Sequence, residues 1–154
     1  MAAADPVASR LAAAQASGAE RLLDVSRESL PEAARRASDG RGFDFVFVCP
    51  GKSAVIAEAM QTIAPGGTLL LFTMPSPEDR LALDGNDLYF REVQVIPSYS
   101  CGPVEMNLAR TLLVQNRIRV SDLVSHRFPI ERAPEAFARA RDPNGAMKVV
   151  LRFD

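Results

Sequence analysis

Two stretches decide the fold: Phe43-Asp44-Phe45-Val46-Phe47-Val48-Cys49-Pro50-Gly51 and Gly66-Gly67-Thr68-Leu69-Leu70-Leu71-Phe72-Thr73-Met74-Pro75. Each is a nearly uninterrupted apolar run that ends in small or turn-forming residues, and a helix-length segment separates the two. Such runs are typical of strands buried on both faces of a parallel sheet that helices cover. Because ligands bind beyond the carboxyl ends of the strands in these sheets, the sequence predicts a binding crevice at residues 49–51 and 73–75.

Length and composition indicate one ordinary globular domain. The chain has 154 residues, of which 47% are hydrophobic and 24% charged, so it is long enough to bury a real core. A net charge of −1 gives no electrostatic reason to expect binding to nucleic acid or to an anionic membrane. Cys49 and Cys101 have neither metal-site nor disulfide-framework spacing, and no apolar run approaches the length of a membrane span. We therefore expect a soluble cytoplasmic protein.

Strand and helix signals alternate along the chain, which is the pattern of a doubly wound α/β sheet. The alanine-rich opening predicts a helix over residues 2–19, with Asp5 as its N-cap and Gly18 at its exit. A loop rich in Pro, Asp and Gly is expected from residue 74 to about residue 87. The remaining expected strands are 21–25, 43–49, 68–73, 92–96, 123–128 and 147–153, and the remaining helices are 29–38, 53–64, 104–117 and about 133–140.

Several residues have a structural interpretation that we prefer to a chemical one. Cys49, at the end of a buried strand, is expected to be a small core residue. Leu108 and Leu112 form a stripe at helical spacing, which predicts a core face. His126 is expected to be a surface or half-buried structural residue. Zinc needs three or four ligands in tetrahedral reach, and Cys101 and His126 do not belong to any compact cluster of such residues.

Seven short motifs occur in an order and spacing that resemble the C-terminal half of zinc-type medium-chain dehydrogenases, nearest to the polyol and threonine dehydrogenase branch. The resemblance covers essentially the whole chain. The motifs are Asp5-Pro6, Gly40-Arg41-Gly42-Phe43-Asp44, Pro65-Gly66-Gly67, Ile96-Pro97-Ser98-Tyr99-Ser100, His126-Arg127-Phe128-Pro129, Ala133-Pro134-Glu135-Ala136-Phe137 and Lys148-Val149-Val150-Leu151.

The resemblance implies a fold and an activity. Residues 1–103 are expected to form a partial Rossmann-like sheet, and residues 104–154 a helix and strand segment that returns to the catalytic domain in full-length relatives. The reaction would be hydride transfer between an alcohol and NAD. The zinc ligands of the family, its first cofactor-domain strand and its Gly-x-Gly-x-x-Gly loop are absent from these residues. No catalytic residue or metal ligand is therefore assigned here, and the strand order 3-2-1-4-5-6 predicts that two strands lack a partner.

The same resemblance implies a set of cofactor contacts. Asp5 matches the acidic residue that accepts hydrogen bonds from the adenosine ribose and favours NAD over NADP, and Arg10 matches a basic position near that ribose. The simpler interpretation, Asp5 as a helix cap alone, stays open. The turn beside the adenosine matches Val48, Cys49, Pro50, Gly51 and Lys52; the nicotinamide contacts match Phe72, Thr73 and Met74; its carboxamide contacts match Ser98 and Tyr99; and the pyrophosphate contact matches Lys148.

Two other kinds of protein remain open as alternatives. The chain is alternatively a non-catalytic interaction module that pairs with another chain, or a zinc-independent quinone or enoyl reductase of the same superfamily. Residues 92–97 resemble the edge strand through which family members pair across a two-fold axis. This last resemblance predicts a homodimer.

Overall fold

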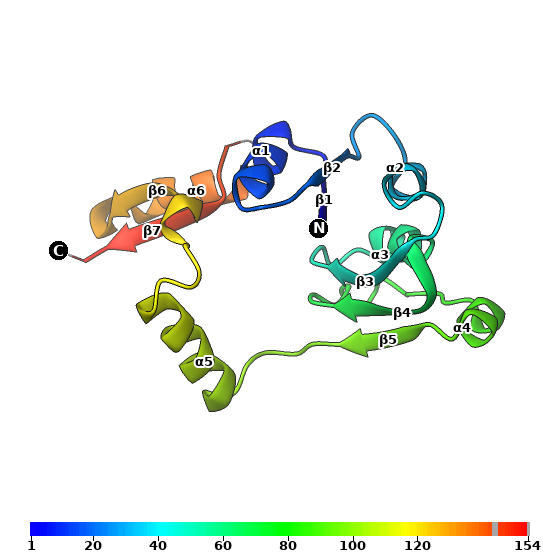
Figure 1. The fold of residues 1–154 in the computed structure, drawn as a ribbon. Coiled ribbons are helices and arrows are strands. Elements are labelled where there is room, and N and C mark those ends of the chain that lie inside the picture. Colours follow the sequence, from blue (N-terminus) through cyan, green and yellow to red (C-terminus); the bar gives the residue numbers. More distant parts are fainter. Residues whose placement is uncertain (143–144, 154) are drawn as a thin grey trace.

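A computed structural model describes residues 1–142 and 145–153, and their strands form three parallel sheets (Figure 1). Their orders are β1-β2, β3-β4-β5 and β6-β7. The strands are β1 Ala2–Asp5, β2 Arg21–Asp24, β3 Phe43–Val48, β4 Ile63–Leu71, β5 Gln94–Pro97, β6 Val124–Pro129 and β7 Lys148–Arg152. The helices are α1 Ala8–Ala16, α2 Leu30–Ala37, α3 Ser53–Met60, α4 Gly85–Arg91, α5 Pro103–Val114 and α6 Ala133–Arg141, with short 3-10 turns η1 Ser121–Leu123 and η2 Ile130–Arg132. The predicted α/β class with parallel pairing is confirmed.

The main core lies between α3 and one face of the β3-β4-β5 sheet. Ile56 of α3 and Leu69 of β4 are both 0% exposed, and Val48, Met60 and Leu71 pack with them. Ile56, Met60 and Ile63 all lie on the buried side. On the opposite face of the same sheet, Phe45 is 71% and Phe47 is 66% exposed. One face of this sheet is therefore a packed core and the other is an uncovered aromatic surface.

Side-chain caps determine where two of the helices begin. The Ser29 hydroxyl accepts the Glu32 N–H at 3.4 Å and donates to the Glu32 carboxylate at 2.8 Å at the start of α2. At α4, the Asp84 carboxylate accepts the N–H groups of Asn86 and Asp87. Both helices thus satisfy first-turn N–H groups that have no partner within the helix.

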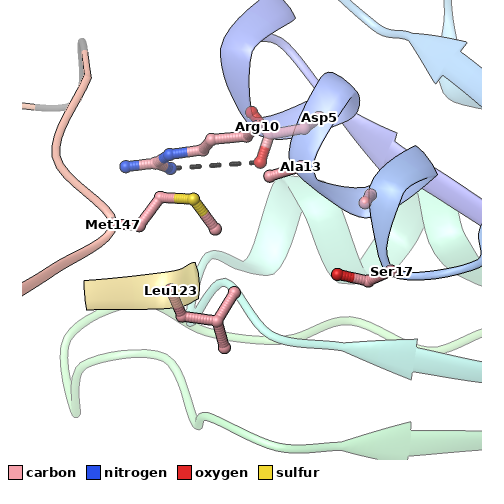
Figure 2. A pocket seen from close by; sticks show the side chains of 7 residues that line it. Asp5, Arg10, Ala13, Ser17, Leu123 and Met147 are labelled. Carbon is pink, nitrogen blue, oxygen red and sulfur yellow. Dashed lines mark ion pairs between the residues drawn. The ribbon is translucent and has the colours of Figure 1, made fainter. Parts of the chain in front are cut away.

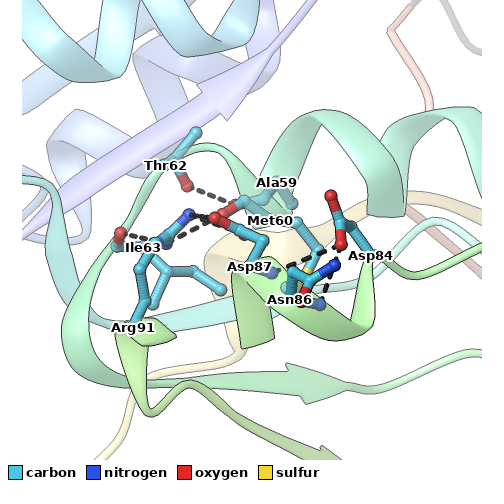
Figure 3. A network of polar contacts seen from close by, with 8 residues as sticks. All are labelled: Ala59, Met60, Thr62, Ile63, Asp84, Asn86, Asp87 and Arg91. Carbon is cyan, nitrogen blue, oxygen red and sulfur yellow. Dashed lines mark hydrogen bonds and ion pairs between the residues drawn. The ribbon is translucent and has the colours of Figure 1, made fainter. Parts of the chain in front are cut away.

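Arg91 joins α4 to the turn between α3 and β4 (Figure 3). Its guanidinium donates to the carbonyl of Ile63 at 2.7 Å and to that of Met60 at 3.3 Å, and it pairs with Asp87 at 2.9 Å. The Met60 carbonyl at the end of α3 therefore receives a cationic donor, which the helix dipole favours.

The N-terminal prediction was wrong in part. Residues 2–5 form β1, paired in parallel with β2 from Ala2 opposite Arg21 to Asp5 opposite Asp24, and α1 starts only at Ala8. Asp5 is not the N-cap of α1. That position belongs to Val7, whose N–H donates to the Asp5 carboxylate at 2.8 Å. The strand pairing, a tertiary contact, overrides the helical propensity of alanine.

Two further boundaries differ from the predictions. Helix α3 ends at Met60, and β4 begins at Ile63 rather than at Thr68 because Phe43 pairs with Ile63 across a register shift. Helix α4 begins within the segment that was expected to be a loop and continues through residues to which no element was assigned, and β5 starts at Gln94 rather than at residue 92. Long-range pairing and the Asp84 cap set these boundaries.

The predicted core face of α5 is wrong. No residue of α5 is buried, and Val104 is 76%, Leu108 59% and Val114 68% exposed. The apolar stripe exists in the sequence, but no described element covers it. Figure 1 shows α5 standing apart from the sheets, joined to them by extended segments.

The C-terminal unit packs α6 against β6 and β7. His126 is half-buried there, and its Nε2 accepts the Arg139 Nε–H at 3.0 Å. Its Nδ1 lies 2.9 Å from the Ser125 hydroxyl, to which it donates because Nε2 is the acceptor. His126 is thus half-buried and held by hydrogen bonds in a structural position, as predicted.

Candidate functional site

The carboxyl ends of β3, β4 and β5 meet at one edge of the sheet. The ladder continues past the strands, since the Phe72 N–H donates to the Val48 carbonyl at 3.0 Å and the Ser98 N–H donates to the Leu71 carbonyl at 2.9 Å. Residues 49–52, 72–74 and 98–99 therefore follow one another along this edge. This is the position that the alternating pattern predicts for a ligand crevice.

Gly51 lies against the segment that follows β4. A Cβ atom on Gly51 would lie 2.5 Å from the Met74 carbonyl oxygen and 2.8 Å from Cγ2 of Thr73. Both distances are shorter than real Cβ contacts, so only glycine allows the two segments to approach this closely. The candidate residues of the two strand ends are in this way held together.

Asp79, which the sequence analysis did not single out, fastens the loop after β4 to the start of α3. Its carboxylate accepts the Ser53 hydroxyl at 2.5 Å and the Ser53 N–H at 3.0 Å. These two hydrogen bonds, the hydroxyl one first, hold the pKa of Asp79 below its usual value. The N-cap residue Lys52 makes no side-chain cap, so Asp79 provides that cap from 26 residues away.

We expect the hydrogen bonds between Asp79 and Ser53 to restrain the loop after β4 to an extent that depends on pH. Because its pKa is lower in the folded chain, the stabilisation is present above the unfolded pKa and is lost as the pH falls through the folded pKa. We expect Asp79→Ala to speed pepsin cleavage within residues 75–84 at about pH 5, and the difference from the unmodified chain to vanish near about pH 2. Peptide mapping measures the two rates, and Asp84→Ala, which removes the neighbouring cap of α4, is the control. Equal rates at about pH 5 would show that the contact does not restrain the loop.

A second group of candidates lines a pocket of about 450 Å³ beside α1 (Figure 2). An Arg10 Nη1 nitrogen lies 3.9 Å from the Asp5 Oδ2 oxygen, and the Arg10 Nη2 group donates to the Ala146 carbonyl at 3.5 Å. The lining residues are Asp5, Arg10, Ala13, Ala14, Ser17, Leu123 and Met147. The pocket thus combines an acidic and a basic group with residues from the C-terminal unit.

The structure does not bring every candidate into one closed site. Phe72 is 62%, Met74 59% and Tyr99 98% exposed, and Lys148, the first residue of β7, is exposed too. Lys148 follows Ala146 and Met147, which lie at the Asp5 and Arg10 pocket. The candidates therefore form two groups, one at the edge of the β3-β4-β5 sheet and one beside α1.

Cys49 was expected in the core, and this prediction is wrong. It follows the last residue of β3 and is exposed, as is Cys101, and both thiols are free. Cys49 follows Val48, whose side chain packs in the α3 core, so alternation turns the Cys49 side chain to the face of the sheet on which Phe45 and Phe47 are exposed.

Within the residues that the structure describes, no group of three His, Cys, Asp or Glu side chains could hold a metal ion. None of the described helices is long and apolar enough to cross a membrane.

The comparisons with known proteins connect this geometry to a family. Residues 1–115 match the family model described as zinc-binding dehydrogenase. The chain belongs to the zinc-binding dehydrogenase family. The predicted family resemblance is confirmed.

Relatives of this family match most of the chain but not most of their own length. Human sorbitol dehydrogenase is 30% identical over 153 residues, which cover 97% of this chain and 42% of the human protein. L-threonine 3-dehydrogenase of Saccharopolyspora erythraea is 25% identical over 132 residues, covering 86% of this chain and 38% of the relative. The chain thus spans about two fifths of the length of these relatives.

A solved structure confirms the fold. An alcohol dehydrogenase from Escherichia coli CFT073, complexed with cofactor NADH, superposes with a TM-score of 0.88 at 21% identity. The superposition covers 99% of this chain and 44% of that one. The arrangement of the three sheets is therefore that of a known dehydrogenase.

Proposed function

We propose that this chain is the cofactor-binding part of an NAD-dependent alcohol or polyol dehydrogenase, and that it holds NAD along the carboxyl edge of its strands. Residues 1–103 would bind the cofactor, and residues 104–154 would return to the catalytic domain. The meeting of three parallel strand ends, with Gly51 in close approach to Met74, is the observation that carries this proposal.

The donor and acceptor groups fit the parts of a dinucleotide. Asp5 offers the Oδ2 oxygen to the ribose hydroxyls while its Oδ1 oxygen accepts the Val7 N–H, and Arg10 lies beside it. Cys49, Pro50, Gly51 and Lys52 would pass the adenosine, and Lys148 would neutralise the pyrophosphate. Phe72, Thr73 and Met74 would lie against the nicotinamide, with Ser98 and Tyr99 at its carboxamide. NAD supplies the hydride acceptor when bound, and these residues bind and orient it.

Cofactor preference tests the proposal. In a chimera that joins this chain to the part of human sorbitol dehydrogenase outside the 153 matched residues, Asp5→Ser should weaken NAD use and improve NADP use. The change removes the ribose acceptor and the charge that repels a 2′-phosphate. The ratio of kcat/KM for the two cofactors measures the effect.

A matched control lies on the neighbouring strand. Asp24 pairs in register with Asp5 at the end of β2, and Asp24→Ser should leave the ratio unchanged. An unchanged ratio in Asp5→Ser itself would show that Asp5 only restrains the turn before α1.

We propose further that the chain resides in the cytoplasm, where exposed free thiols such as Cys49 and Cys101 stay reduced.

We also propose that the chain forms a homodimer through β5, which is the edge strand of its sheet. Because the Ser98 N–H points to β4, alternation turns the Val95 N–H and carbonyl to the free edge. Pro97 has no N–H, and the Val93 N–H donates to Leu88. An antiparallel pair centred on Val95, with each copy donating to the other, fits this edge.

The dimer is tested by Val95→Pro. This change removes the one N–H of the edge pair, so light scattering after size exclusion should show a monomer in place of a dimer. Val95→Ala keeps the N–H and should remain dimeric. A monomeric unmodified chain, or a dimer indifferent to the proline, would overturn this interface.

A further inference from the structure

We propose that Asp79 is a positioning residue of the cofactor site, which acts on NAD through residues 49–53 and not by contact with it. Its carboxylate joins the loop after β4 to the start of α3. The residues just before α3 are those that would pass the adenosine. This role rests on the proposed function and deepens it, because it makes the affinity for NAD depend on a residue outside the contact set.

The first observation is that the segment before α3 is held at both ends by the loop that follows β4. At Gly51 the chain lies against Met74, since a Cβ atom there would be 2.5 Å from the Met74 carbonyl oxygen. Two residues later, the Ser53 N–H donates to the Asp79 carboxylate at 3.0 Å, and the Ser53 hydroxyl donates to it at 2.5 Å. The course of the chain between Gly51 and Ser53 therefore depends on both contacts.

The second observation is that Asp79 is the one described residue whose side chain caps the start of α3. Lys52, at the N-cap position, makes no side-chain cap, and the first turn of α3 contains no acidic residue. Within residues 75–80, no other side chain hydrogen-bonds to the rest of the described chain. A single carboxylate thus meets the Ser53 N–H and the positive end of the α3 dipole. Without it, the start of α3 has no side-chain cap.

The third observation is that the far end of the loop is attached independently of Asp79. Leu81 packs against the core cluster that contains Ile56, and Asp84 caps α4. The loss of Asp79 should therefore loosen the chain locally, at residues 51–53 and 75–80, and leave the core in place. Because a loosened segment must be ordered again when a ligand binds to it, such a change weakens binding more than it weakens the fold.

The test titrates the full chain with NAD as the probe and follows amide chemical shifts. We expect Asp79→Ala to raise the dissociation constant at least about fivefold and to speed amide exchange at Ser53. Asp79→Asn keeps an oxygen that accepts from Ser53, so its dissociation constant should stay within about twofold of that of the unmodified chain. Ser53→Ala should weaken binding in the unmodified chain but not in Asp79→Ala, where the contact that it removes is already lost.

The matched control is Asp84→Ala, which removes the corresponding cap of α4. Each aspartate caps the first turn of one helix, so both variants should lower the thermal unfolding midpoint by a similar small amount. Only Asp79→Ala should weaken NAD binding. Unchanged affinity in Asp79→Ala, or an equal loss in Asp84→Ala, would overturn the positioning role and leave the proposed function standing. Absence of NAD-induced shifts at residues 49–52 of the unmodified chain would overturn both.

Discussion

Replacing Leu69 by alanine is expected to lower the free energy of unfolding by about 2–5 kcal/mol, the cost of a cavity in a packed core. Leu69 lies in β4, the central strand of its sheet, and is 0% exposed. It packs in the cluster of Val48, Ile56 and Leu71, which are all buried. The space left by the removed side chain therefore remains as a cavity inside the core. Urea unfolding followed by circular dichroism measures the change.

The control for this prediction is Leu108→Ala on α5. Leu108 is 59% exposed, and no residue of its helix is buried, so the same chemical change should cost less than about 0.5 kcal/mol. A loss at Leu108 as large as that at Leu69 would show that α5 is packed in solution. An unchanged stability in Leu69→Ala would contradict the core described here.

Strands β3 and β4 could be predicted because the apolar pattern of their sequences continues along almost their whole length. Residues 43–48 and 68–71 are apolar at nearly every position, and a sheet with two potential faces to cover requires this. The same pattern could not show that only one face is covered. Phe45 and Phe47 have the composition of core residues but are exposed, since burial depends on which element packs on each face and the sequence of a strand does not show that.

The boundaries that could not be predicted depend on long-range contacts. Residues 2–5 have helical propensity but are paired with β2, and Ile63 is drawn into β4 by Phe43. The leucine stripe of α5 shows the converse, because local periodicity predicts an apolar face but not a partner for it. Local sequence sets the type of most elements, whereas pairing sets their ends and, at residues 2–5, the type as well.

In the candidate site too, some residues could be predicted from the sequence and others could not. Its strand-end residues follow from topology alone, because parallel strands place their carboxyl ends at one edge. Arg10 comes near Asp5 through one turn of α1, which the sequence order also suggests. Asp79 had no such signal, since 26 residues that include α3 and β4 separate it from Ser53, and the loop that carries it has no periodicity. Contacts of that kind become visible only in the folded chain.

Gly51 provides the second large expected effect, and it links the fold to the proposed site. Gly51→Ala places a Cβ atom 2.5 Å from a backbone oxygen of Met74, which no rotamer change can relieve. We expect a loss of about 1–3 kcal/mol in the free energy of unfolding, since the two strand ends must separate. Gly85→Ala is the matched control, because nothing lies within 4 Å of its added Cβ and alanine should be neutral or stabilising there by up to about 1 kcal/mol. Denaturation curves of both variants measure the difference, and in the chimera Gly51→Ala should also raise the KM for NAD, since Thr73 and Met74 move with the strand end. Equal stability of the two variants would show that residues 49–51 and 73–75 are not held together, and the crevice proposed between them would lose its support.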